Sequence, residues 1–296
     1  MILKKRSPIG KNLYRTKVSL INHKDAYITP KIDFKTSTSI WNVDEFIKRR
    51  IRDWRRITNE DGHTGERAEK FRKDHFSVYT GTYSVFPIPL IEWIIIRYAG
   101  KKGMKVLDAF SGGPARAIAC SIMGYNYYGF EIRKEQITEN ERTIMDLGLK
   151  NITYYLSDGR FLDCDIFDFD IAITCPPYHN LETYSDQIDD LSNLPTYAAF
   201  NAAMWMCACS HLKHMKPGAF VCIVVGNFRD KKGELIDFRG HTVQNFKEAG
   251  FLFWQDIILS KNFASAAKRA GNAWKGMKLV PRHEHLLIFR TPYEEM

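Results

Sequence analysis

The sequence predicts an α/β protein organised around a doubly wound, mostly parallel sheet of seven strands. Short runs of apolar and β-branched residues alternate along the chain with segments long enough for helices, a pattern typical of parallel sheets with helices on both faces. Of the 296 residues, 45% are hydrophobic and 26% are charged. This balance suits a folded globular chain with a sizeable core.

Seven segments have the short apolar character of buried strands. They span residues 105–110, 126–132, 152–156, 169–174, 220–225, 251–259 and 285–289. The segments around and between them have helical length and spacing. Helices are expected over residues 89–98, 134–147, 197–214 and 240–249, with one more that ends near Met123.

The net charge of +9 lies entirely near the N-terminus. Residues 1–75 contain 19 Lys and Arg against 10 Asp and Glu, whereas residues 76–296 contain 24 of each. We therefore expect a basic N-terminal region over 1–75, irregular to about residue 40, and a folded domain over 76–296. Such asymmetry indicates a polyanionic partner, nucleic acid before membrane. A solvated basic tail is the alternative.

Within the basic region, a helix is expected to begin near Asn42, with Glu45 three residues later. Apolar residues then recur at helical spacing from Phe46 to Ile57, while Lys and Arg fill most positions between them. The cationic face of this helix is suited to contact phosphates, although a solvated face stays open as the alternative.

The sequence favours a reduced, cytoplasmic protein. The longest apolar stretch, Ile88 to Ile96, is interrupted by Glu92 and is too short to span a bilayer. The basic N-terminus lacks the apolar segment of a secretory signal. Six cysteines, at positions 120, 164, 175, 207, 209 and 222, form no C-x-x-C pair. We expect neither disulfides nor a metal site.

A nucleotide-like ligand is expected at the end of the first strand. Asp108 and Phe110 lead into Ser111-Gly112-Gly113, where glycines let a backbone approach a ligand and a following helix N-terminus favours an anionic group. Glu131 closes the second strand and is placed to accept both hydroxyls of a ribose. Asp158 closes the third strand and could accept from an exocyclic amine of adenine. The alternative is that these acids only cap helices or turns.

The fourth strand ends in an unusual turn. Asp170 to Thr174 reads as a buried strand, and Cys175-Pro176-Pro177-Tyr178 follows it directly. Neither proline can donate to a sheet, and each restricts its predecessor to extended geometry. The turn is therefore rigid, with backbone carbonyls beside an aromatic face, an arrangement that suits a flat base. It lies where open α/β sheets bind their ligands.

These residues resemble the S-adenosylmethionine-dependent amino-methyltransferases that modify adenine N6 or cytosine N4 in DNA. Asp108 to Gly112 follows the family's D-x-F-x-G-x-G loop, and Cys175 to Tyr178 corresponds to its catalytic (D/N/S)-P-P-(Y/F/W) tetrad. The resemblance covers about residues 76–290. It implies a class I, Rossmann-like methyltransferase fold, S-adenosylmethionine as cofactor, and double-stranded DNA as partner.

The resemblance also assigns roles to individual residues. The cofactor would be held by Phe86, Pro87, Asp108, Phe110, Ser111, Gly112, Gly113, Glu131 and Asp158. The amine would be held by Cys175 and Pro176, with Pro177 stiffening the turn and Tyr178 stacking on a flipped base. The segment 282–289 resembles the end of many family members.

Two positions depart from the family pattern. Pro114 replaces the second loop glycine, with Gly113 one position early, and the tetrad opens with Cys175. A base amine is a weak nucleophile, because its lone pair is delocalised, and acceptors must localise that pair. Since a thiol is a weak acceptor, the Pro176 carbonyl is expected to carry more of the task. Cysteine is closer in size to serine, the residue typical of cytosine-N4 enzymes, so cytosine is favoured and adenine stays open.

Several functional alternatives remain at this stage. No large target-recognition domain follows the catalytic turn, so DNA contacts are expected from residues 1–75 and from the basic segment 260–282, which contains Phe263 and Trp274. The leading hypothesis is a DNA amino-methyltransferase of a restriction-modification system or a mobile element, as a monomer or homodimer. An RNA base methyltransferase and a nucleic-acid-binding protein with a lapsed active site are the alternatives.

Overall fold

The computed structural model describes residues 40–42, 86, 88–181, 185, 187, 189–260, 271 and 273–293. Among the helices in these ranges, none combines the length and the apolarity needed to cross a membrane. The predicted irregular arm, the predicted helix over 46–57, and Pro87 and Phe263 lie outside the described residues.

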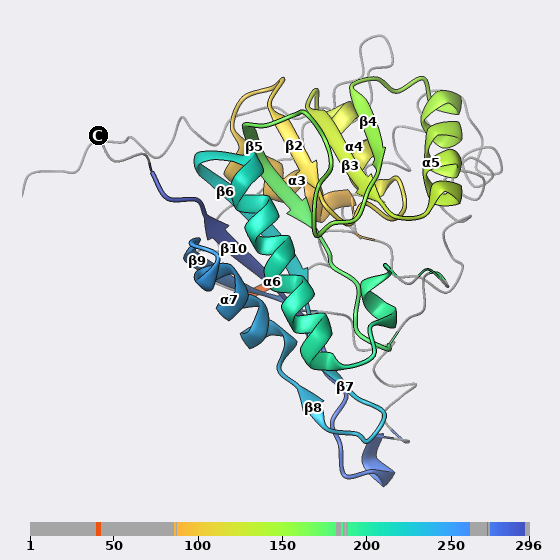
Figure 1. The fold of residues 1–296 in the computed structure, drawn as a ribbon, viewed down its shortest axis with the longest axis vertical. Helices are drawn as coiled ribbons and strands as arrows, with labels where there is room; N and C mark the ends of the chain where they lie inside the picture. The colour runs from red at the N-terminus through yellow and green to blue at the C-terminus, as the bar shows by residue number, and fades with distance from the viewer. Residues whose placement is uncertain are drawn as a thin grey trace, which may run out of the picture.

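Eight strands form one sheet in the order β1-β9-β10-β6-β5-β2-β3-β4 (Figure 1). Their bounds are β1 Ile40–Asn42, β2 Lys105–Asp108, β3 Asn126–Glu131, β4 Ile152–Leu156, β5 Phe169–Thr174, β6 Met215–Val225, β9 Leu252–Ser260 and β10 His283–Arg290. β10 is antiparallel to both neighbours, and the other pairs are parallel. Seven strands lie at the predicted positions, so the mostly parallel α/β sheet is confirmed.

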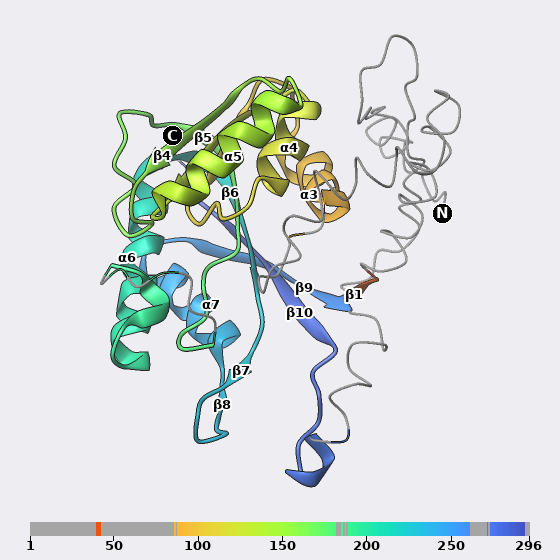
Figure 2. The same cartoon turned by 90° about the vertical axis from the view of Figure 1, so that its right-hand side faces the viewer.

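The eighth strand, β1, comes from the basic N-terminal region. It pairs in parallel with the outer edge of β9, with Ile40 opposite Ile258 and Asn42 opposite Ser260 (Figure 2). Asn42, predicted to begin a helix, is thus the last residue of a strand. This pairing joins the region 1–75 to the sheet of the region 76–296.

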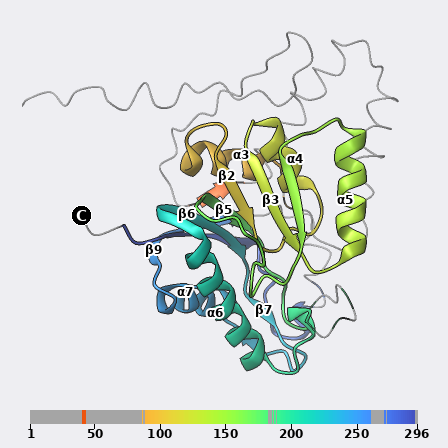
Figure 3. The ribbon, with the colours of Figure 1, turned by 45° about the horizontal axis from the view of Figure 1, so that its top comes forward.

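Helices cover both faces of the sheet, as the doubly wound prediction requires. The helical segments are α3 Ile88–Ile94, the π-helical η2 Ile95–Ala99, α4 Ala115–Ile122, α5 Lys134–Asp146, the short η3 Leu191–Asn193, α6 Tyr197–His214 and α7 Phe238–Glu248. α3, α4 and α5 pack on one face, and α6 and α7 on the other. Figure 3 shows α5 along the β4 edge and α6 beside α7.

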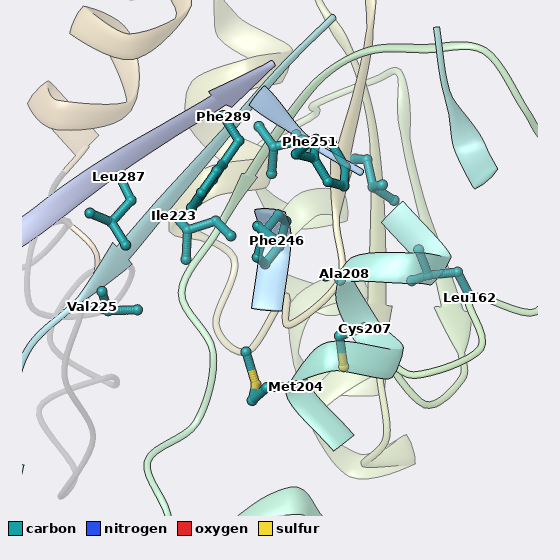
Figure 4. Close-up of a cluster of buried hydrophobic side chains, with 14 of the residues drawn as sticks. Leu162, Met204, Cys207, Ala208, Ile223, Val225, Phe246, Phe251, Leu287 and Phe289 are labelled. Atoms are coloured by element: carbon teal, nitrogen blue, oxygen red, sulfur yellow. The ribbon is translucent and has the colours of Figure 1, made fainter. Parts of the chain in front are cut away.

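Each face of the sheet has its own buried core. Leu286 and Ile288 of β10 point into the core under α3 and α4, whereas Leu287 and Phe289 point into the core under α6 and α7 (Figure 4). This alternation follows from the two-residue period of a strand. The same alternation determines on which face of the sheet the first residue after each strand lies.

The structure corrects one predicted boundary. The strand predicted over 220–225 begins earlier, because β6 starts at Met215, directly after α6, and contains Pro217 and Gly218. Gly218 has a φ of +72°, and the Tyr293 ring packs where its Cβ would stand. The sequence analysis also missed a small hairpin formed by β7 Phe228–Arg229 and β8 Leu235–Ile236.

His211 of α6 makes the stability of the fold sensitive to acid. Its ring is fully buried, and its Nδ1 lies 2.7 Å from the Cys207 carbonyl. Burial lowers the pKa of His211 to about 4. The native state therefore keeps the ring neutral, while the unfolded chain takes up a proton below its ordinary pKa of about 6.5.

We predict that His211→Phe flattens the dependence of stability on pH. The contribution of the neutral ring is present above pH ~6.5 and is lost as the pH falls toward 4, a change of up to about 3 kcal/mol. Urea unfolding of the wild type and the variant between pH 7.5 and 4 measures this difference. His283→Phe, which replaces an exposed ring, is the matched control. If the stability of His211→Phe depended on pH as that of the wild type does, the prediction would be contradicted.

Candidate active site

The candidate site lies where the strand order reverses, between β2 and β5. β3 and β4 extend the sheet on one side of this pair, and β6, β10 and β9 extend it on the other. The loops after β2 and β5 therefore diverge and leave room at the carboxyl edge of the sheet, where open α/β sheets bind ligands. The predicted cofactor loop and the predicted Pro-Pro turn are these two loops.

One carboxylate ties the two loops together. Asp108, the last residue of β2, is fully buried, and its Oδ1 accepts a hydrogen bond of 2.9 Å from Thr174 Oγ1 at the end of β5. Its Oδ2 accepts a bond of 2.6 Å from the Tyr127 hydroxyl and is ion-paired with Arg116 of α4. Asp108 is thus enclosed behind the loops, where its observed contacts position both of them.

Arg116 is a residue that the sequence analysis did not single out. Its Nη2 donates to the carbonyls of Phe110 at 2.6 Å and Ser111 at 3.0 Å, while its Nε faces Asp108. Burial alone would lower the pKa of Arg116, but the Asp108 carboxylate raises it overall. The guanidinium also lies 5.0 Å from the centre of the Phe86 ring. Arg116 therefore fixes the backbone of the cofactor loop from behind.

The loop closes in spite of the proline at position 114. Gly112 has a φ of +47°, a backbone conformation that favours glycine. Its N–H donates to Glu131 Oε2 at 2.9 Å, and its carbonyl accepts from Asn140 Nδ2 at 2.7 Å. Pro114 caps α4, where the missing N–H has no cost, and its carbonyl accepts the first helical bond from Ile118.

Glu131 lies beside this loop at the end of β3. Its Oε1 accepts from the Arg133 N–H at 3.0 Å, and its side chain is 9% exposed. Burial raises the pKa of Glu131, and the hydrogen bonds and the charge of Arg133 oppose this effect. Each carboxylate oxygen has a second lone pair. Glu131 can therefore still accept from two neighbouring hydroxyl groups.

Asp158 is held by an arginine of its own turn. Arg160 donates to Asp158 Oδ2 from Nε at 2.8 Å and from Nη2 at 2.5 Å, and its N–H donates to Oδ1 at 2.8 Å. Between them, Gly159 has no room for a Cβ, which would lie 2.6 Å from Cε1 of Phe110. This contact brings the turn after β4 against the cofactor loop. Asp158 Oδ1 accepts one of the hydrogen bonds from Arg160 and Oδ2 accepts two, so Oδ1 has more capacity left for a ligand.

Tyr178 stands on edge against two phenylalanines. Its ring centre lies 5.6 Å from that of Phe228 and 5.5 Å from that of Phe238, and both pairs are in edge-to-face geometry. Pro176 is buried, whereas Cys175 and Tyr178 are half-buried, and Cys175 packs against the core under α3 and α4. The ring is thus fixed by its neighbours while part of it stays accessible, as a stacking platform requires.

The structure therefore brings most of the predicted site residues to one edge of the sheet. Phe86 joins them through Arg116, and Phe110 joins Asp158 through Gly159. Among the described residues, no group of three His, Cys, Asp or Glu could hold a metal ion, and no disulfide joins any of the six cysteines. The partners Arg116 and Arg160 had no sequence signal beyond a basic residue shortly after each loop.

We predict that Asp108→Asn destabilises the protein by about 3 kcal/mol, because it leaves the Arg116 guanidinium buried without its counter-charge. Denaturant unfolding measures the loss. The control is Asp189→Asn, which removes a 67% exposed carboxylate 3.3 Å from Arg160 and should cost less than about 1 kcal/mol. Equal stabilities of the Asp108 variant and the wild type would show that the ion pair does not hold the loops.

Comparison with known proteins supports the fold. No protein-family model and no curated protein match the chain. Among solved structures, TrmN from Thermus thermophilus is 15% identical over 71% of this chain, with a TM-score of 0.50. The chain spans about half (51%) of TrmN. The [4+2]-cyclase SpnF is 16% identical over 70% of this chain and 81% of its own, also at 0.50.

These similarities, together with the strand order, establish the class I, Rossmann-like methyltransferase fold predicted from the sequence. Identities of 15% and 16% indicate a shared fold only, so these similarities do not identify the reaction. The inclusion of a cyclase shows that one fold can host different chemistries. The resemblance to DNA amino-methyltransferases stays a prediction.

Proposed function

We propose that the protein transfers a methyl group from S-adenosylmethionine to an exocyclic amino group of a base in double-stranded DNA, with cytosine N4 favoured over adenine N6. The observation that carries the proposal is the coupling of the cofactor loop to the Pro-Pro turn through Asp108 and Thr174, 2.9 Å apart. A transfer reaction needs two substrates held in fixed alignment. This hydrogen bond supports such an alignment.

The residues around the cofactor loop fit S-adenosylmethionine. Glu131 has lone pairs for the ribose hydroxyls, and Asp158 Oδ1 can accept from the adenine amine. Ser111 Oγ is buried and has no hydrogen-bond partner among the described residues. A hydroxyl left in that state costs about 1–3 kcal/mol, so the loop holds an unused polar group where a polar ligand is expected. Bound here, the cofactor would supply an electrophilic methyl group.

The Pro-Pro turn would hold the amine that receives the methyl group. The Pro176 carbonyl would accept a hydrogen bond from the amine and localise its lone pair, with the Cys175 thiol as a weaker second acceptor. Tyr178 would stack on the base, which must leave the duplex to reach this recessed edge. The nitrogen lone pair would form the new N–C bond as the bond from the methyl group to sulfur breaks, with the sulfur keeping that electron pair in S-adenosylhomocysteine. The proton released from the nitrogen would pass to solvent water.

The direct test is transfer of a labelled methyl group by the purified full-length protein. We expect incorporation into duplex DNA and none into tRNA or rRNA. Incorporation into RNA alone would replace the proposal with the RNA methyltransferase alternative. No incorporation into either, together with no binding of S-adenosylhomocysteine, would favour the lapsed-enzyme alternative.

We predict that Glu131→Ala weakens binding of S-adenosylhomocysteine at least about tenfold, since hydrogen bonds to a charged group are worth about 1.5–3 kcal/mol. Titration calorimetry measures the affinity. Glu135→Ala, an exposed change in the first turn of α5, is the matched control. If both variants bind like the wild type, the ribose is held elsewhere.

We predict that Tyr178→Ala lowers methyl transfer about 10- to 100-fold, because base stacking is worth about 1–3 kcal/mol, while the affinity for S-adenosylhomocysteine stays unchanged. Tyr178→Phe retains the ring and should retain most of the activity. Single-turnover transfer to duplex DNA separates the variants. Full activity of Tyr178→Ala would exclude a stacking role for this ring.

A further inference from the structure

Two exposed segments project from the sheet next to Tyr178. The hairpin arm comprises residues 228–236, which include β7 and β8, and the β10 arm comprises residues 273–282, which lead into β10. Figures 1 and 2 show both extending beyond the carboxyl edge of the parallel strands, at the same end of the molecule. The sequence analysis did not recognise the hairpin arm.

We infer that the two arms together form one surface that binds the double-stranded DNA flanking the target base. The inference deepens the proposed function and rests on it. It assigns to the hairpin arm a partner that neither its sequence nor the fold comparisons indicate. The positions at which the arms begin, their contact with each other and their exposed side chains support this surface.

The hairpin arm begins at the candidate base platform. Phe228, its first residue, is buried with its ring 5.6 Å from that of Tyr178. The preceding Asn227 is hydrogen-bonded to the start of α7. Its Nδ2 donates to Asp237 Oδ1 at 3.1 Å, and its Oδ1 accepts from the Arg239 N–H at 2.9 Å. The root of this arm is therefore rigid.

The β10 arm ends at the same platform. Two residues after its end, the Cγ of Glu284 lies 3.2 Å from the point where a Cβ would stand on Gly226, and the Tyr178 hydroxyl lies 3.4 Å from that point. The end of β6 and the start of β10 are paired, with His285 opposite Val225, so a base stacked on Tyr178 would have the roots of both arms beside it. The DNA that carries the base would then run along the surface that the arms form.

The arms also contact each other. Lys278 of the β10 arm lies against Gly233 in the hairpin turn, with Nζ 2.5 Å from the position of a Cβ. Gly233 has a φ of +89° and accepts a hydrogen bond of 2.8 Å from Arg229 Nη1 through its carbonyl. A larger residue at position 233 would be strained and would displace the lysine. The arms are thus one connected surface.

The hairpin turn directs its cations outward. Asp230 Oδ1 accepts from the N–H groups of Lys232 at 2.9 Å and Glu234 at 2.8 Å. These two hydrogen bonds hold the turn closed and use the Asp230 carboxylate inside it. Lys231 and Lys232 are exposed at the tip. Since a fully extended chain spans about 3.3 Å per residue, they lie within about 13 Å of Phe228. That reach corresponds to at most about four base pairs of duplex.

The β10 arm combines cations with exposed apolar side chains. Its first residues form a closed turn, in which the N–H groups of Met277 and Lys278 donate to the carbonyls of Trp274 and Ala273. Trp274 is 78% exposed, Met277 97% and Leu279 82%. Residues 273–282 include three Lys or Arg and no acid. Exposed apolar groups beside cations suit a nucleic acid, whose bases stack and whose phosphates are anionic.

The test is the double variant Lys231→Gln/Lys232→Gln, which leaves the Asp230 hydrogen bonds to the backbone intact. Binding of the full-length protein to a labelled duplex is measured over a range of salt concentrations. The slope of log K against log salt should shrink by about 1.8, since each phosphate contact contributes about 0.9. Affinity near 0.1 M salt should fall about tenfold or more.

The matched control is Lys101→Gln/Lys102→Gln, which removes two exposed lysines just before β2, at the opposite edge of the sheet. Its slope should equal that of the wild type. An unchanged slope in the hairpin variant, or an equal change in the control, would overturn the inference. So would weakened binding of RNA with unchanged binding of duplex DNA, or a wild type that does not bind duplex DNA.

A second variant tests the β10 arm without altering its charge. Trp274→Ala should lower the affinity for duplex DNA about tenfold and leave the salt slope unchanged. Unchanged affinity would exclude the β10 arm from the DNA-binding surface. If the wild type binds duplex DNA through the arms but transfers no methyl group to it, the proposed reaction fails and the binding inference stands.

Discussion

The candidate site depends on the buried ion pair between Asp108 and Arg116. A buried pair costs desolvation that its mutual attraction offsets only when further hydrogen bonds satisfy both partners. Here Asp108 also accepts from Thr174 and Tyr127, and Arg116 also donates to the cofactor loop. The pair therefore joins the ends of β2 and β5 into one rigid unit. Neither loop can move without breaking contacts of the other.

The second organising feature is Tyr178, at which three kinds of structure meet. The Pro-Pro turn delivers the ring, Phe228 and Phe238 hold it on edge, and the two arms begin beside it. The class I fold is shared with a cyclase, so the fold does not determine the reaction. The case for amino-methylation rests on this local arrangement and on the chemistry of a carbonyl beside an aromatic face.

Local sequence signals predicted much of the fold and of the site. Apolar runs located seven strands, and helical length and spacing located α6, which the structure shows to be capped by the Thr196 hydroxyl accepting from the Ala199 N–H. Contacts between distant residues were not predictable, because Arg116 and Arg160 have no local pattern that names their partners. The strand predicted to begin at residue 220 begins at Met215 instead, because β6 continues through Pro217, a residue unusual inside a strand. β7 and β8 are two residues each, too short for a periodic signal.

The most direct test of amino-methylation is nucleoside mass spectrometry of DNA from a host that expresses the protein. We expect N4-methylcytosine, or N6-methyladenine as the second possibility, above the level in a host that expresses the Tyr178→Ala variant. Methylated DNA nucleosides at equal levels in the two hosts would contradict it. A methylated nucleoside found only in the RNA of the wild-type host would contradict it as well.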